Sequence, residues 1–126
     1  MPSRTPSRTR SARIAAARGL GALRYAPAAS RLEEIVNGRA IRNADLTEKL
    51  AVFDAYALAA GNDAIPVLEK LLHGRGRLGR KLPAELRACA ATALGRIETP
   101  AARAALEAAS DDDEPIVRGA IQRALR

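Results

Sequence analysis

Residues 86–97, Leu-Arg-Ala-Cys-Ala-Ala-Thr-Ala-Leu-Gly-Arg-Ile, resemble an earlier stretch, residues 12–23, Ala-Arg-Ile-Ala-Ala-Ala-Arg-Gly-Leu-Gly-Ala-Leu. The two stretches align without a gap at an offset of 74 residues, and the alignment continues until Leu32 pairs with Leu106. Self-similarity at a fixed spacing is the signature of a repeat architecture. This pair of stretches therefore decides the fold class.

Two further copies extend the pattern. A middle copy lies at an offset of 38 residues from the last full one and pairs Lys49 with Arg87 and Tyr56 with Leu94. A partial copy covers residues 117–125. We expect repeats over about 11–44, 45–82 and 83–110 and a half repeat over 111–126, preceded by a disordered basic arm over 1–10.

Each unit is expected to form two helices. In the third unit, apolar residues recur at the spacing of one helix face: Leu86, Ala90, Ala93, Leu94 and Ile97. The predicted helices cover about 11–23, 27–37, 45–60, 63–73, 83–97, 100–109 and 113–125. Neither helix of a pair can bury its stripe alone, so the pairs stack. The sequence predicts an all-α protein, a short right-handed α-solenoid of about three and a half helix pairs, or about seven helices.

Helix boundaries carry their own signals. Asp45 with Glu48 has the spacing of a capping box, and Thr99-Pro100 is an N-cap followed by proline at the first helical position. Asn62 is expected to begin the helix that follows it. Gly61 and Gly74 suit chain reversal after a helix.

The composition predicts a thin core. Of the 126 residues 48 % are hydrophobic, but 29 are alanine, while Leu, Ile, Val and Phe together number 27 and Trp is absent. Alanine and glycine at the contacts let helix axes approach closely. No run of about 18 apolar residues exists, which excludes a membrane span. The single cysteine excludes a disulfide framework and a multi-cysteine zinc site.

The net charge of +7 is unevenly distributed. Seven arginines precede the first acid, Glu33, and a second basic cluster lies within 75–81, opposed by the acidic run 111–114. Such a field attracts nucleic acid or acidic proteins. Eighteen arginines against three lysines, with abundant alanine, also fit the codon bias of a GC-rich genome. The first residues lack the apolar stretch of a secretory signal, so we expect a cytoplasmic protein.

The third unit and the partial last copy resemble bacterial HEAT-type repeats, including the HEAT-like repeats of phycobilisome lyases. The resemblance covers about residues 11–126 and rests on the pattern Leu86-Arg87-x-x-Ala90-x-x-Ala93-Leu94-Gly95-x-Ile97-x-x-Pro100-x-Ala102 and on Val117-Arg118-x5-Ala124-Leu125. It implies a structural ladder in which a basic residue of each unit pairs with an aspartate near the preceding turn. The matching positions are Arg13, Lys49, Arg87 and Arg118, of which Lys49 departs from the arginine of the pattern.

No catalytic, metal or cofactor residues are predicted. Residues 74–79 match GxGxxG, but a dinucleotide fingerprint needs a preceding strand, and a helix is predicted there. Cys89 aligns with alanines of the other units, which favours a buried, inert thiol over a reactive one. His73 is the only histidine and sits at a predicted helix C-terminus. The resemblance likewise implies a scaffold, because no residue of the pattern is catalytic.

The leading hypothesis is a non-catalytic scaffold or adaptor that binds another protein through the concave face, lined by the second helix of each pair, or through the basic loop. The candidate partner-binding residues are Arg31, Glu34, Asn37, Lys70, His73, Arg75, Arg77, Arg80, Lys81, Arg103 and Glu107. We also expect that the chain is the tail of a longer array or that an uncapped end associates with another chain.

Two alternatives remain open. One is nucleic-acid or phosphate binding through the basic arm and the 74–81 loop, which a steep loss of binding with salt would favour. The other is an accessory role like that of a chromophore lyase, suggested by the family resemblance alone. The absence of an obvious nucleophile or acid–base set counts against this second alternative.

Overall fold

The computed structural model describes Ile14, residues 27–74 and residues 82–126. The predicted basic arm, nearly all of the predicted helix 11–23 and the basic segment 75–81 lie outside the described residues. Within the described part the elements follow in the order α2 (Pro27–Asn37), η1 (Ala40–Asn43), α3 (Leu46–Ala60), η2 (Gly61–Ala64), α4 (Ile65–Leu72), α5 (Ala84–Ile97), α6 (Pro100–Ala108) and α7 (Pro115–Leu125). These residues contain no strand, which confirms the all-α prediction.

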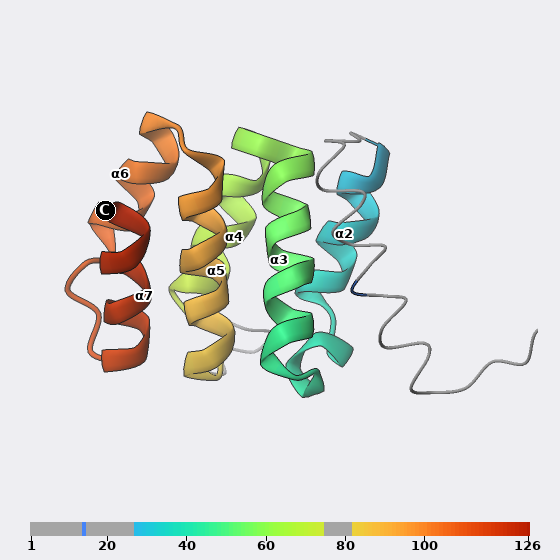
Figure 1. Ribbon diagram of the computed structural model, residues 1–126, viewed down its shortest axis with the longest axis horizontal. Coiled ribbons are helices and arrows are strands. Elements are labelled where there is room, and N and C mark those ends of the chain that lie inside the picture. The colour runs from blue at the N-terminus through green and yellow to red at the C-terminus, as the bar shows by residue number, and fades with distance from the viewer. Residues whose placement is uncertain (1–13, 15–26, 75–81) are drawn as a thin grey trace, which may run out of the picture.

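The helices form two layers (Figure 1). α3, α5 and α7 stand side by side, and each contacts the next. α2, α4 and α6 lie behind them: α2 packs on α3, α4 on α5, and α6 on both α5 and α7. Among the described helices, the first helices of the predicted units (α3, α5 and α7) therefore lie in one layer and the second helices (α2, α4 and α6) in the other.

Side-chain caps begin two of the helices as the sequence predicted. The Asp45 carboxylate accepts a hydrogen bond from the Glu48 backbone N–H at 2.9 Å, at the start of α3. The Thr99 hydroxyl accepts from the Ala102 backbone N–H at 3.2 Å, at the start of α6. Each bond satisfies one N–H of the first helical turn, which has no partner within the helix.

The predicted start at Asn62 is wrong. Residues 61–64 form the 3-10 turn η2, and α4 begins at Ile65 without a side-chain cap. The Asn62 side chain instead accepts a hydrogen bond from the Thr99 hydroxyl at 2.7 Å, which links two successive units. Gly61 ends α3 with a φ of 58°, as expected for a glycine where the chain reverses.

Residues 38–44, which lie between the predicted helices 27–37 and 45–60, also contain structure. η1 occupies most of this stretch and buries Ile41, which is 2 % exposed. A pattern of apolar residues every three or four positions cannot indicate so short an element, because a single turn buries only one side chain.

The core is thin and built from small residues, as the composition predicted. Leu86, Ala90 and Leu94 of the α5 stripe are buried, as are Val117, Ala120 and Ile121 of α7. At the α5–α7 contact a Cβ on Gly95 would lie 2.7 Å from the Ala124 Cβ. The absence of a side chain at Gly95 therefore permits the close approach of these two helices.

Candidate interaction surface

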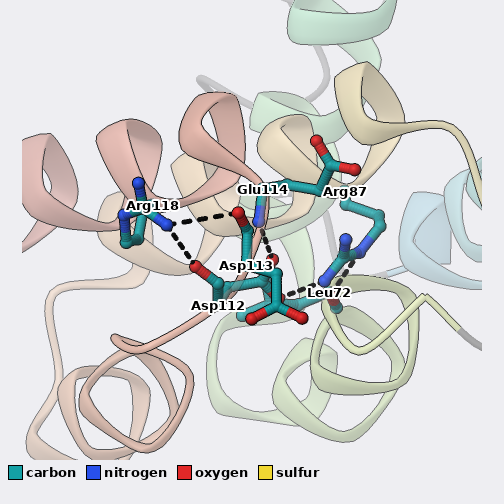
Figure 2. Close-up of polar contacts among 6 residues, drawn as sticks. All are labelled: Leu72, Arg87, Asp112, Asp113, Glu114 and Arg118. Atoms are coloured by element: carbon teal, nitrogen blue, oxygen red, sulfur yellow. Dashed lines mark hydrogen bonds and ion pairs between the residues drawn. The ribbon is translucent and has the colours of Figure 1, made fainter.

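Arg87 of α5 joins two turns of the chain (Figure 2). Its Nε donates to the Leu72 carbonyl at 2.9 Å, at the end of α4, and its other arm forms an ion pair with Asp112. The Arg87 side chain is 8 % exposed and the Asp112 side chain 14 %. Low exposure weakens the screening of the ion pair by water. The ion pair holds α5 to the turn that follows it, and the hydrogen bond to Leu72 holds it to the turn that precedes it.

The ladder differs from the one that the family resemblance implied. Arg87 pairs with an aspartate of the following turn, and to the preceding turn it donates a hydrogen bond to a carbonyl. Arg118 contacts the preceding turn, but it donates to the backbone carbonyls of Asp112 at 2.8 Å and Asp113 at 3.2 Å (Figure 2). The reason is geometric. The Asp112 carboxylate accepts from Arg87 and from the Glu114 backbone N–H, so the acceptors that remain for Arg118 in this turn are backbone carbonyls.

Lys49 occupies the corresponding position of the middle unit and also reaches forward. Its ammonium lies 2.6 Å from the Glu85 carboxylate at the start of α5, and the residue is 5 % exposed. Lys49 and Arg87 thus each bind an acid of the next unit, through different partner positions. Arg13, the remaining ladder candidate, lies outside the described residues.

The predicted partner-binding residues divide into two groups. All of those on described helices are exposed and lie on the α2–α4–α6 layer or at its helix ends: Arg31, Glu34, Asn37, Lys70, His73, Arg103 and Glu107. α4 contacts α6, so the residues of these two helices share one surface. The other four, Arg75, Arg77, Arg80 and Lys81, lie outside the described residues.

The two side chains considered for chemistry in the sequence, Cys89 and His73, lie in different environments. Cys89 is 1 % exposed, and burial raises the pKa of its thiol to about 11, which keeps it protonated near neutral pH. His73 is exposed and ends α4. Among the described residues no three His, Cys, Asp or Glu side chains cluster closely enough to hold a metal ion.

A cleft of about 710 Å³ lies where the C-terminal ends of α5 and α7 meet the first part of α6. Its floor is apolar and includes Leu94, Ala102 and Leu106. Its polar lining contains four arginines, Arg96, Arg103, Arg123 and Arg126, and one acid, Glu98.

The sequence interpretation found only Arg103 among these four arginines. A signal for two of the other three existed, because Arg96 and Arg123 lie in the last turns of α5 and α7. Two helices in equivalent repeat positions lie side by side, and basic residues in both last turns then gather at one end. A cation in the last turn also favours the helix by opposing the negative end of its dipole, so the pattern alone does not indicate a site.

Helix pairs stacked in two layers define the class of helical-repeat proteins. The family model of the PBS lyase HEAT-like repeat matches this chain at residues 12–38 and 86–112. The chain therefore carries HEAT-like repeats, as the sequence pattern indicated. The second match runs from α5 through α6 to Asp112, the partner of Arg87.

No curated protein and no solved structure matches the chain. None of the helices in the described residues has the length and apolar character needed to cross a membrane.

Proposed function

We propose that this chain is a short α-solenoid of HEAT-like helix pairs and acts as a non-catalytic module that binds another protein. The observation that carries the proposal is the exposed polar row on α2, α4 and α6, represented by Glu34, Lys70 and Glu107. Seven candidate residues chosen from the repeat pattern are all solvent-accessible on this one layer. A partner lying along the layer would contact several units at once.

The chemistry of the row supports a polar docking surface. The aromatic side chains in the described residues, Phe53 and Tyr56, are each 1 % exposed. Protein interfaces with very high affinity usually contain exposed aromatic anchors. We therefore propose that binding is of moderate affinity and depends on charged and polar contacts.

Photocrosslinking tests this proposal. A photoreactive residue is introduced in the second-helix layer at position 34, 70 or 107, and the purified variants are irradiated in lysate of the source cell. The same residue at Thr47 of α3 or Ile116 of α7, both exposed on the other layer and outside the lining of the cleft between α5, α6 and α7, is the matched control. We expect the first set to form a discrete adduct with one protein and the controls to form none. Equal labelling from both layers, or none from either, would contradict the proposal.

A second candidate is nucleic-acid binding through the basic segment 75–81. It is supported by the Leu82 N–H, which donates to the Gly74 carbonyl at 3.1 Å and so holds the two ends of this segment together. Four basic residues lie in the sequence between these two ends. Titration with duplex DNA at two salt concentrations tests it: binding that weakens steeply with salt supports it, and no binding even near 50 mM salt eliminates it.

The family's name also raises an accessory role like that of a lyase. The only thiol, Cys89, is buried and protonated near neutral pH, and neither property suits a nucleophile. Incubation of the protein with a bilin, followed by mass spectrometry, tests this role. A covalent adduct would support it, and we expect none.

A further inference from the structure

The α5–α6–α7 cleft, made by the C-terminal ends of α5 and α7 and the first part of α6, carries an excess of positive charge. Among the described residues, the side chains that line it include four guanidinium groups and the carboxylate of Glu98. Within the described residues, Arg123 and Arg126 form no ion pair with any acid. Both are exposed, and both lie at the C-terminal end of α7, so their positive charge is available to an incoming anion.

The other two arginines are partly engaged. Arg96 forms an ion pair with Asp54 through Nε at 2.5 Å. Arg103 donates through one terminal nitrogen to the Leu125 carbonyl at 3.0 Å, and its Nε lies 3.9 Å from the Glu107 carboxylate. A guanidinium carries five N–H donors, so each of these bonds leaves several for a ligand. The bonds also orient the two side chains, which lowers the entropy lost when a ligand binds.

Besides the charged residues, the lining contains two threonines, Thr92 and Thr99, and is otherwise apolar. Pro100 is exposed and Gly95 and Ala124 are half-buried, so these three provide the accessible apolar floor, while Leu94, Leu106 and Ala120 are buried. A free inorganic anion would gain nothing from such a floor, whereas a peptide with acidic side chains on one face and aliphatic ones on the other would contact both parts. The volume of about 710 Å³ lies in the range of ligand-binding clefts.

We infer that the α5–α6–α7 cleft is a docking site for an acidic amphipathic segment of the partner protein. The inference rests on the proposed function and adds to it the place and chemistry of one contact. Carboxylates of the segment bind the arginine rim, where Arg–carboxylate pairs form two parallel hydrogen bonds. Aliphatic side chains of the segment cover the floor. Nucleic acid fits less well, because no aromatic side chain lines the cleft for a base to stack on.

Fluorescence anisotropy with synthetic peptides tests the inference. The probe is a labelled peptide of about three helical turns, with Glu on one face and Leu and Ala on the other. The test variant is R123E/R126E, which reverses two exposed charges without breaking a hydrogen bond that holds the fold. The control is R39E/R42E, which makes the same charge change at two exposed arginines in and beside η1, away from the cleft.

We expect the wild-type protein to bind the Glu peptide, R123E/R126E to bind it about tenfold or more weakly, and R39E/R42E to stay within about twofold. A peptide with Lys in place of Glu should bind R123E/R126E better than wild type. A peptide with Ser in place of Leu should bind wild type more weakly, because it cannot cover the apolar floor. Circular dichroism confirms that each variant is folded.

Four outcomes would overturn the inference. In the first, the wild-type protein does not bind the Glu peptide. In the second, both double variants weaken binding equally, which shows that only net charge matters.

In the third, duplex DNA binds wild type but not R123E/R126E, and the Glu peptide does not displace the DNA. In the fourth, wild type self-associates and R123E/R126E does not, which assigns the cleft to the exposed acids within 111–114 of a second copy. If one of these outcomes is observed while the otherwise wild-type chain still gives the crosslinks from positions 34, 70 and 107, only this inference fails. If that chain gives no such crosslinks, the proposed function itself is contradicted.

Discussion

Gly95 of α5 and Ala124 of α7 touch with no room for another methyl group, since a Cβ at position 95 would lie 2.7 Å from the Ala124 Cβ and 3.2 Å from its Cα. Both of these atoms belong to a residue whose position is set by its helix backbone. The contact can therefore be relieved only if α7 moves as a unit.

The first prediction is that Gly95→Ala lowers the free energy of unfolding by about 1–3 kcal/mol, the usual cost of overpacking. Alanine favours a helix over glycine by about 1 kcal/mol, so a loss would show that the clash outweighs this gain. Gly119 of α7 is the matched control, because a Cβ there would meet only the flexible end of Arg123, at 3.4 Å. Gly119→Ala should raise stability. Denaturant unfolding measures both, and equal effects would contradict the argument.

The second prediction concerns the Arg87–Asp112 pair. Arg87→Met should cost about 3–5 kcal/mol, because it removes the counter-ion of the weakly exposed Asp112 carboxylate, which keeps only the Glu114 backbone N–H, and the donor to the Leu72 carbonyl. Arg96→Met removes the ion pair with Asp54, whose side chains are 52 % and 34 % exposed, and should cost less than about 1 kcal/mol. A similar loss in the two variants by thermal or denaturant unfolding would show that Arg87 is not the stronger link.

The third prediction is a loss of stability in alkali. Burial raises the pKa of Cys89 from an ordinary value of 9.0 to about 11, so between these values the unfolded chain loses the thiol proton while the folded chain keeps it. The unfolded state then binds fewer protons, and stability falls as the pH rises from about 9 to 11. Cys89→Ala should remove part of this decline. Tyr56 contributes in the same direction, since burial and Glu33 raise the pKa of its phenol well above its usual range.

Chemical denaturation at a series of pH values checks this prediction. Above pH 9 the wild-type curve should fall more steeply than that of Cys89→Ala, and parallel curves would contradict it. Thiol reagents should also react slowly with the folded protein and rapidly after unfolding, because Cys89 is 1 % exposed.

The fourth prediction concerns the turn between α5 and α6. Glu98 has a φ of 58° and a ψ of 40°, and it is the only residue other than glycine with a positive φ in the described part of the chain. This left-handed conformation costs most residues about 1–2 kcal/mol, so Glu98→Gly should stabilise the fold by about 0.5–1 kcal/mol after its entropic cost. Gly61→Ala is a test in the opposite direction, since φ there is 58° and ψ −133°, a region that residues with a Cβ avoid more strongly, and a Cβ would meet nothing within 4 Å. It should destabilise, and a neutral result at both positions would contradict the strain argument.

The sequence by itself determined the helical architecture. The stripe from Leu86 to Ile97 and the caps at Asp45 and Thr99 depend on residues a few positions apart, and local geometry of this kind can be deduced from spacing. The alignment of the copies then places equivalent helices side by side. Even the close helix contact at Gly95 was predictable in kind, since Gly95 recurs as Gly21 in the first copy.

Only the tertiary structure decided which polar groups meet. Asn62 has the local chemistry of a helix cap, yet it accepts from the Thr99 hydroxyl 37 residues away, because the stacking of units brings that donor within reach. The Asp112 carboxylate likewise binds Arg87, whereas Arg118 binds only backbone carbonyls of this turn, because the course of the backbone directs the carboxylate toward Arg87. The arginine-lined cleft arises in the same way, from ends of α5, α6 and α7 that are adjacent in space but separated along the chain. Spacing fixes what each helix buries, whereas the partners of its long polar side chains depend on distances between units.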